Sequence, residues 1–265
     1  MADYYLRAGA TGSGAANPTF PNLPFWGDLD GWAGLNANPG DRLFIHEDSD
    51  PIYVYNGNNR TNSKFNPSGT NASGAGIEVW RDPTTPSGNR PWIDGSQLNN
   101  SGWADNGDTT WQKQLGGRSG NVVLRHRVTG VLTILNFYAS DKRAQLAAAD
   151  AGWMHDNING LLSIKLPGGL NPNTQTTYDI RVSIIGMAVE INSGSRADGF
   201  TIRGVGFQCF SLQGCNFSNV TKFVIDDVHA RFTGGDVNAS WPVGGGFQCT
   251  GDCDGILYVD CIAEN

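Results

Sequence analysis

The sequence predicts an all-β protein built mainly as a parallel solenoid, and three observations lead to this fold class. Residues 200–208 line up with residues 223–231 and again with residues 256–264 as a repeated pair of short strands. The first two copies are 23 residues apart, a length that suits a unit burying its apolar face only by stacking on its neighbours. The composition of 36 glycines, 12 prolines and only 16% charged residues fits many tight turns.

A further short strand precedes each copy, and turn-forming segments complete the unit. These strands are residues 188–191, 209–212 and 246–249, and the turns are residues 193–198, 214–221 and 251–254. The second and third copies are 33 residues apart, because the Gly- and Pro-bearing segment 234–245 lengthens the unit. We expect this segment to be a loop outside the coil, and loops on a rigid scaffold frequently carry binding and catalytic residues.

The N-terminal part, residues 1–96, is expected to form strands of the first coils. The predicted strands there are bounded by Gly, Pro and Asn and comprise residues 4–8, 42–46, 52–55, 76–80 and 90–96. The polar segment 57–76 between two of them is predicted to be a surface loop. Regular coils are expected again over residues 176–265.

Residues 97–175 have a different pattern from the coils. Strands of hairpin length at residues 122–127, 131–135 and 161–166 are bounded by Gly and Asn, which predicts a small antiparallel β insertion. Within this insertion, residues 141–151 contain strong helix formers, and we expect one short helix with Asp141 as its N-cap.

The charge and hydropathy of the chain exclude several functions. A formal net charge of −7 and a pI near 4.9 argue against a general binder of nucleic acid phosphates. No apolar run approaches the roughly 18–20 residues that span a bilayer, so no membrane insertion is expected. The first residues also lack the basic stretch and apolar core of a signal peptide.

All five cysteines fall in the repeat region, and an odd number leaves at least one unpaired within a monomer. Cys249 and Cys253 have a loose metal-ligand spacing without a nearby histidine, so we interpret the cysteines as small buried apolar residues rather than ligands. Asp252 and Asp254 could bind calcium, but aspartates in Gly-rich turns usually bond their own backbone. We therefore expect no cofactor, with calcium as the alternative.

Strand alternation separates inward from outward side chains in the second copy of the repeat. Outward positions fall to Asp226, His229 and Arg231, with a corner near Asp227. The inward positions are Phe223, Ile225, Val228, Ala230 and Phe232. By the same register Arg203 stacks near Asp226, and Arg231 shares a column with Gln208 and Glu264. Coils stack about 4.8 Å apart, so these side chains should touch.

Two chemistries fit the candidate catalytic residues Asp226, Asp227, His229 and Arg231. A lyase needs a base, His229 or Lys222, and a cation, Arg203 or Arg231, that neutralises a developing enolate. A glycoside hydrolase needs two carboxylates, for which the chain offers Asp226, Asp227, Asp236 and Glu264. Trp241, in the loop 234–245, is the preferred aromatic for stacking on sugar. The same charged residues also fit a structural ladder of ion pairs on a solvated face.

A family resemblance covers nearly the whole chain. The order of residues 4–8, 39–43 and 91–95, a Trp-containing insertion, and residues 199–204 resembles the right-handed parallel β-helix proteins of the pectate-lyase-like superfamily. That superfamily includes polysaccharide lyases, glycoside hydrolases and phage tail-spike depolymerases. The resemblance implies a protein that binds and cleaves an extracellular polysaccharide and is extracellular or virion-associated.

The alternative is a non-catalytic structural or adhesion module of a tail fibre or surface filament. The chain stops in the middle of its repeat at Asn265 without a visible cap. We therefore expect a truncated end, or an exposed last coil through which copies of the chain could associate as a homo-oligomer.

Overall fold

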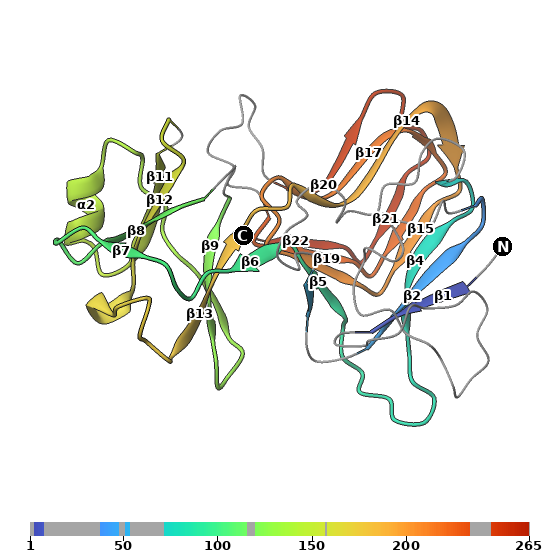
Figure 1. Ribbon diagram of the computed structural model, residues 1–265. Coiled ribbons are helices and arrows are strands. Elements are labelled where there is room, and N and C mark those ends of the chain that lie inside the picture. Colours follow the sequence, from blue (N-terminus) through green and yellow to red (C-terminus); the bar gives the residue numbers. More distant parts are fainter. Residues whose placement is uncertain are drawn as a thin grey trace.

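The computed structural model describes residues 3–7, 38–47, 51–53, 72–115, 120–156, 158–233 and 245–264. Within them the chain is all-β, as predicted, with three parallel and two antiparallel sheets (Figure 1). None of the helices in this part of the chain is long and apolar enough to cross a membrane.

The three parallel sheets contain every strand of the repeat region. The six-stranded sheet has the order β1 (Asp3–Leu6), β2 (Arg42–His46), β4 (Gly76–Trp80), β15 (Thr201–Arg203), β18 (Val224–Asp226) and β21 (Leu257–Val259). The five-stranded sheet has the order β22 (Ile262–Glu264), β19 (His229–Arg231), β16 (Gly206–Gln208), β5 (Trp92–Asp94) and β3 (Ile52–Tyr53). The three-stranded sheet comprises β14 (Met187–Asp198), β17 (Gln213–Thr221) and β20 (Gly245–Thr250).

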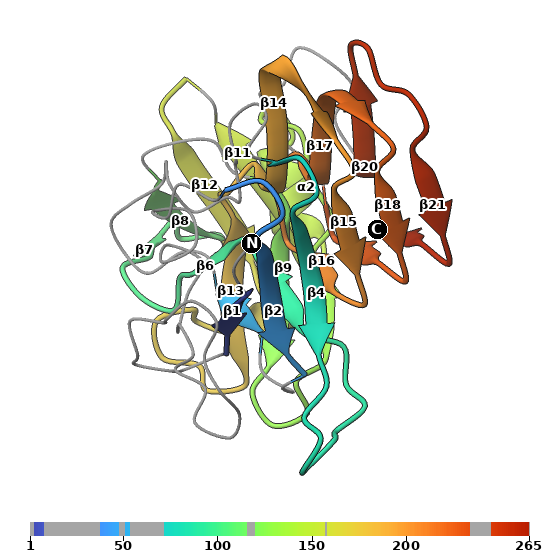
Figure 2. The same ribbon diagram turned by 90° about the vertical axis from the view of Figure 1, so that its right-hand side faces the viewer.

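Successive strands of the chain visit the three sheets in turn. β14, β15 and β16 each enter a different sheet, and β17 to β19 and β20 to β22 follow the same order. Equivalent strands pair in parallel, so that Ile202 aligns with Ile225 and Ile225 with Tyr258. Figure 2 shows β4, β15, β18 and β21 side by side. The copies identified in the sequence are therefore in register in space. The segments 193–198 and 214–221, predicted as turns, belong instead to β14 and β17, so that part of the prediction is wrong.

The chain enters the six-stranded sheet through a left-handed backbone position. Two residues before the first strand position, φ is positive in five successive strands, at Gly40, Gly74, Gly199, Lys222 and Gly255. A residue with a Cβ pays about 1–2 kcal/mol in this region, which explains the glycines. Lys222 is the exception, with φ of 53°.

One hydrophobic core lies between the three parallel sheets. Ile202, Phe207 and Phe217, one from each sheet, are fully buried in the same cluster. Among the predicted inward residues, Phe223, Ile225, Val228 and Ala230 are likewise 0% exposed. Phe232 is only partly buried, because its φ of 52° places it at a corner rather than inside a strand.

The antiparallel part of the chain has its own core, which contains Trp103, Trp153 and Ile164. Its first sheet has the order β10 (Leu132–Ile134), β9 (Val122–His126), β13 (Tyr178–Ser183) and β6 (Ser96–Leu98). Its second has the order β11 (Gly152–Asp156), β12 (Leu161–Lys165), β8 (Trp111–Gln114) and β7 (Ala104–Asp105). A 3₁₀ turn, η2 (Pro167–Gly169), follows β12.

The helix predicted over residues 141–151 is shorter than expected. It forms as α2 (Arg143–Ala148), and its N-cap is Lys142, which makes no side-chain capping bond, rather than Asp141. Ala149 already has extended backbone with ψ of 163°, since the chain turns there towards β11. Local helix propensity therefore predicts that a helix forms here, but not the residues at which it begins and ends.

The left-handed position at Gly199 yields a stability prediction. A Cβ on Gly199 would meet only ordinary contacts, the nearest being Gly74 N at 3.8 Å, so Gly199→Ala tests backbone strain alone. We expect it to lower the free energy of unfolding by about 1–2 kcal/mol, measured by chemical denaturation. Gly245→Ala is the control, since its Cβ meets no described atom within 4 Å and its φ is not left-handed. Equal effects of the two substitutions would contradict this explanation.

Candidate functional site

The predicted substrate-binding residue Arg203 and the predicted catalytic residue Asp226 form an ion pair on the outer face of the six-stranded sheet. Arg203 and Asp226 are register partners, and Arg203 Nε lies 3.3 Å from Asp226 Oδ2. Glu78, on β4, aligns with Arg203 on its other side. Charges therefore alternate along this row, which matches the structural ladder considered from the sequence. Exposed pairs of this kind contribute at most about 1 kcal/mol each.

The structure separates Asp226 from the histidine and arginine with which the sequence analysis had grouped it. Asp227 has a φ of 52°, so the chain turns between β18 and β19, as the predicted corner requires. Asp226 consequently lies in the six-stranded sheet, whereas His229 and Arg231 lie in the five-stranded sheet. The single outward face expected for these three residues is therefore corrected to two faces that meet at Asp227.

His229 and Arg231 lie beside a tryptophan on the outer face of the five-stranded sheet. The Arg231 guanidinium carbon lies 3.8 Å from the centroid of the Trp92 ring. The His229 imidazole meets the same indole edge-on, with centroids 6.5 Å apart. We call Trp92, Gln208, His229 and Arg231, together with the buried Asp94, the Trp92 cluster.

A glycine makes room for the indole. Gly206 is the strand residue between Trp92 and His229, and it pairs with both. A Cβ at this position would lie 2.4 Å from Cε3 of Trp92. The absence of a side chain lets the indole extend across a whole strand, where it meets residues of β19.

A chain of hydrogen bonds to residues of the same sheet holds the guanidinium of Arg231 in place. Its Nε and Nη2 donate to Gln208 Oε1 at 3.0 and 2.7 Å, and Gln208 Nε2 donates to Asp94 Oδ2 at 2.7 Å. Asp94 is fully buried and also accepts from the Ser96 backbone N–H at 2.8 Å. Arg231 is thus fixed on the indole rather than free to sample solvent.

The buried carboxyl of Asp94 links the Trp92 cluster to the antiparallel part of the chain. Burial raises its pKa, and the charge of Arg181 on β13 is the largest effect that opposes this. Arg181 is itself 7% exposed and stacks on Tyr53 of β3, with 3.7 Å between the guanidinium carbon and the ring centroid. β13 lies beyond residue 175, where regular coils were expected, but it pairs in an antiparallel sheet and supplies the countercharge beneath the cluster.

The corner residue Asp227 binds a second arginine. Arg90 Nη2 lies 2.6 Å from Asp227 Oδ1, and Arg90 also donates to the backbone carbonyl of Asp227. Arg90 is the last residue of the segment 81–90. At the other end of this segment, Arg81 Nη1 lies 2.9 Å from Oε2 of the buried Glu47 carboxylate, which holds the segment in place. A cation is thereby placed over the corner, close to His229.

The imidazole of His229 is kept neutral by this environment. Partial burial is the largest effect lowering its pKa from the ordinary 6.5, and the nearby charge of Arg90 lowers it further. Asp227 and Glu264 act in the opposite direction but do not overcome these two effects. At neutral pH His229 therefore offers a free nitrogen lone pair beside the cation of Arg231, which is the pairing of base and neutralising charge needed for proton abstraction.

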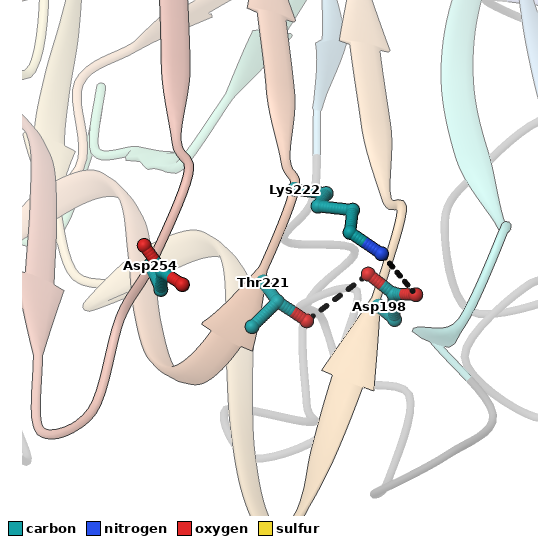
Figure 3. A pocket seen from close by; sticks show the side chains of 4 residues that line it. All are labelled: Asp198, Thr221, Lys222 and Asp254. Carbon is teal, nitrogen blue, oxygen red and sulfur yellow. Dashed lines mark hydrogen bonds and ion pairs between the residues drawn. The ribbon is translucent and has the colours of Figure 1, made fainter.

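Lys222 lies elsewhere, in a pocket of about 400 Å³ that Asp198, Thr221 and Asp254 also line (Figure 3). Thr221 Oγ1 donates to Asp198 Oδ1 at 3.0 Å, and Lys222 Nζ lies 3.4 Å from Asp198 Oδ2. Lys222 is thus an ion-pair partner here, and it is not adjacent to the Trp92 cluster. Lys222 has a left-handed φ of 53°, and backbone strain of this kind is common at functional sites, so the pocket is a second candidate site.

The remaining predictions fall partly outside the described residues. Glu264 is exposed and is the register partner of Arg231, as expected. Asp236 and Trp241 lie outside the described part of the chain. Within the described ranges no group of three or more histidine, cysteine or acidic side chains could hold a metal ion, and this includes Asp252 and Asp254.

Sequence reasoning missed Trp92, Arg90 and Asp94. All three lie within residues 90–96, for which the sequence pattern predicts only a strand. The available signal was an outward Trp and Asp two residues apart on a strand, but their partners on β16 and β19 are more than a hundred residues away. Only the register of the five-stranded sheet brings them together.

Comparison with known proteins identifies no family: no protein-family model and no curated protein matches the sequence. One similar solved structure is described as a glycoside hydrolase, with a TM-score of 0.49 and 7% identity over 86% of this chain and 62% of the other. Another is the GH136 lacto-N-biosidase from Eubacterium ramulus, in native and selenomethionine forms, with a TM-score of 0.46 and 10% identity over 99% of this chain and 34% of that protein. The chain thus spans less than two thirds of the length of these proteins.

The electrostatics of the corner predict how His229 titrates. Arg90→Ala removes a cation and leaves the Asp227 carboxylate unneutralised, so we expect the pKa of His229 to rise, measured from its ring proton shifts by NMR. Arg203→Ala, which frees Asp226 in the other sheet, is the matched control and should leave this pKa unchanged.

Because folding lowers the pKa of His229, protonation of His229 favours the unfolded chain. The free energy of unfolding should therefore fall as the pH drops from 6.5 towards the pKa of His229 in the folded chain.

The close approach at Gly206 predicts a specific structural defect. Gly206→Ala should displace the indole of Trp92 and cost about 1–3 kcal/mol of unfolding free energy, since the added methyl cannot be accommodated without movement. The displacement is measured by NMR as a shift of the Trp92 indole N–H resonance, assigned with Trp92→Phe. An unchanged resonance in a folded Gly206→Ala protein would contradict the packing described.

Proposed function

We propose that this chain is a carbohydrate-active protein that binds an acidic polysaccharide at the Trp92 cluster and cleaves it by β-elimination. The observation that carries the proposal is the pairing of a fixed guanidinium, Arg231, with an imidazole, His229, on one indole. The part of the Trp92 indole that Arg231 does not cover offers apolar surface to a sugar ring, and the guanidinium N–H groups that do not bond Gln208 offer donors to a sugar carboxylate.

The fold-level part of this proposal is a right-handed parallel β-helix of the pectate-lyase-like type. Three parallel sheets visited in a constant order, around one shared core, support it. The sheet-visiting order also supports the resemblance noted from the sequence. With it we propose an extracellular or virion-associated location, where such a substrate is found.

The proposed reaction assigns one role to each group. Arg231 binds the carboxylate of a uronic acid residue and disperses the negative charge that develops on it. His229 takes the proton from the carbon that bears this carboxylate. The bond between the neighbouring carbon and the glycosidic oxygen then breaks, and the departing oxygen takes up a proton from water. One product keeps a carbon–carbon double bond and the other gains a new reducing end. Trp92 holds the sugar ring, and Arg90 maintains the neutral state of His229.

A second candidate function, a non-catalytic structural or adhesion module, is favoured by a different observation. The carboxylates of Asp226 and Asp227 are both engaged by arginines, Arg203 and Arg90. Such pairing is typical of a ladder that stabilises a surface, and it leaves neither carboxylate poised as the acid of a hydrolase. Under this reading the Trp92 cluster binds sugar without cleaving it.

The test is incubation of the purified chain with polygalacturonate, alginate and hyaluronate, and with neutral dextran and starch. We expect reducing ends together with new ultraviolet absorbance from unsaturated uronates, on an acidic polymer only. His229→Gln should lower kcat/KM by about 10²–10⁴-fold, the range for loss of a general base. Arg203→Gln, on the other sheet, is the matched control and should retain activity.

Three other outcomes are informative. Reducing ends without absorbance would replace the lyase chemistry with hydrolysis. Binding without any cleavage, lost in Trp92→Ala, would establish the adhesion module. Neither binding nor cleavage of any acidic polymer by the folded chain would overturn the proposal.

A further inference from the structure

Four of the five cysteines gather around the last described coil and its neighbour. Cys215 on β17 and Cys249 on β20 belong to adjacent strands of the three-stranded sheet, and Cys253 and Cys261 pack against the same core. All four are reduced in this structure. The proposed carbohydrate chemistry uses none of them.

Two of these thiols lie on either side of one tight turn. Cys249 is near the end of β20, and Gly251, with φ of 69°, reverses the chain so that the Cys253 N–H donates to the Gly251 carbonyl at 3.0 Å. Cys253 Sγ points back to the strand end, 3.2 Å from the carbonyl oxygen of Thr250. Cys253 Sγ also lies 3.7 Å from the carbonyl oxygen of Phe217, which is the register partner of Cys249, and Cys249 Sγ lies 3.1 Å from the Tyr258 hydroxyl. The Cys253 thiol therefore lies beside the end of β20 that carries Cys249.

We propose that Cys249 and Cys253 are a disulfide-forming pair that closes this turn. The oxidant is a small disulfide such as oxidised glutathione. One thiolate attacks it and releases one reduced glutathione, and the second thiolate then attacks the mixed disulfide and releases another. The net change is two thiols converted to one disulfide, with both hydrogens and both electrons transferred to glutathione.

Exposure separates this pair from Cys209 and Cys215, whereas Cys261 is partly exposed like Cys253 and differs in what its thiol contacts. Cys249 is exposed and Cys253 is partly exposed, so a small disulfide can reach the first and the second can resolve it. Cys209 and Cys215 are fully buried. Cys261 is directed away into hydrogen bonds with the carbonyls of Ile225 and Val259, at 3.2 and 3.3 Å.

The neighbouring contacts indicate what the bond would do. Asp252, inside the turn, donates its backbone N–H to the side chain of Asn219 on β17 at 3.2 Å, and Thr221 forms a bridge with Asp254 just beyond it. The turn thus connects the third coil to the second. A covalent closure would restrict opening of this connection and should slow amide exchange at residues 250–254.

The experiment uses the full chain in a glutathione redox buffer, followed by alkylation of free thiols under denaturing conditions. Digestion with a protease that cleaves before aspartate cuts at Asp252, between the two cysteines, so the fragments stay joined only if the disulfide is present. We expect joined fragments with both cysteines unalkylated and the mass of two hydrogens lost. Reduction should separate them.

Matched variants complete the test. Cys261→Ser should leave the joined fragments unchanged, whereas Cys249→Ser should abolish them and leave Cys253 alkylated. Alkylation of both Cys249 and Cys253 in the oxidised wild-type chain, or linkage of Cys249 to Cys215 or Cys261, would overturn the proposal. The wild-type mapping is decisive even if Cys249→Ser fails to fold.

Discussion

The parallel register between successive coils is the constraint on which the rest of this structure depends. Each strand hydrogen-bonds to the equivalent strand of the next coil about 4.8 Å away, so a residue type at one position meets the equivalent position above and below. That register requires the chain to turn at the same places in every coil. Left-handed residues at those places, such as Gly199 and Lys222, make the turns possible.

The same register creates the Trp92 cluster. Because Gly206 lies between Trp92 and His229, the indole can cross one strand and meet side chains of the next. Because Asp94, Gln208 and Arg231 occupy one row, a hydrogen-bond chain leads from a buried carboxyl to a partly buried guanidinium. A shift of the register by one residue would reverse the face of every one of these side chains and remove the cluster.

Burying Asp94 costs free energy, and the structure offsets it from several directions. Ser96, Gln208 and Arg181 each favour its charged form, against the desolvation that raises its pKa. One residue from a strand of a parallel sheet and two from the antiparallel part therefore converge on one carboxyl. Loss of any one partner leaves a buried polar group unsatisfied, which is more costly than the average hydrogen bond is favourable. This network gives the cluster its fixed geometry, and fixed geometry is what a binding or catalytic site needs.

The amino-acid sequence by itself determined the all-β class, the repeated strand pair, the corner at Asp227 and the inward positions from Phe223 to Ala230, because these follow from local turn chemistry and alternation. It also gave the columns of Arg203 with Asp226 and of Gln208 with Arg231. Only the tertiary structure decided that Asp226 and His229 face different ways, and that Trp92, Arg90 and Asp94 join His229 and Arg231. Those contacts connect segments separated by more than a hundred residues, including the antiparallel part of the chain, and no local pattern encodes which distant strand becomes a neighbour.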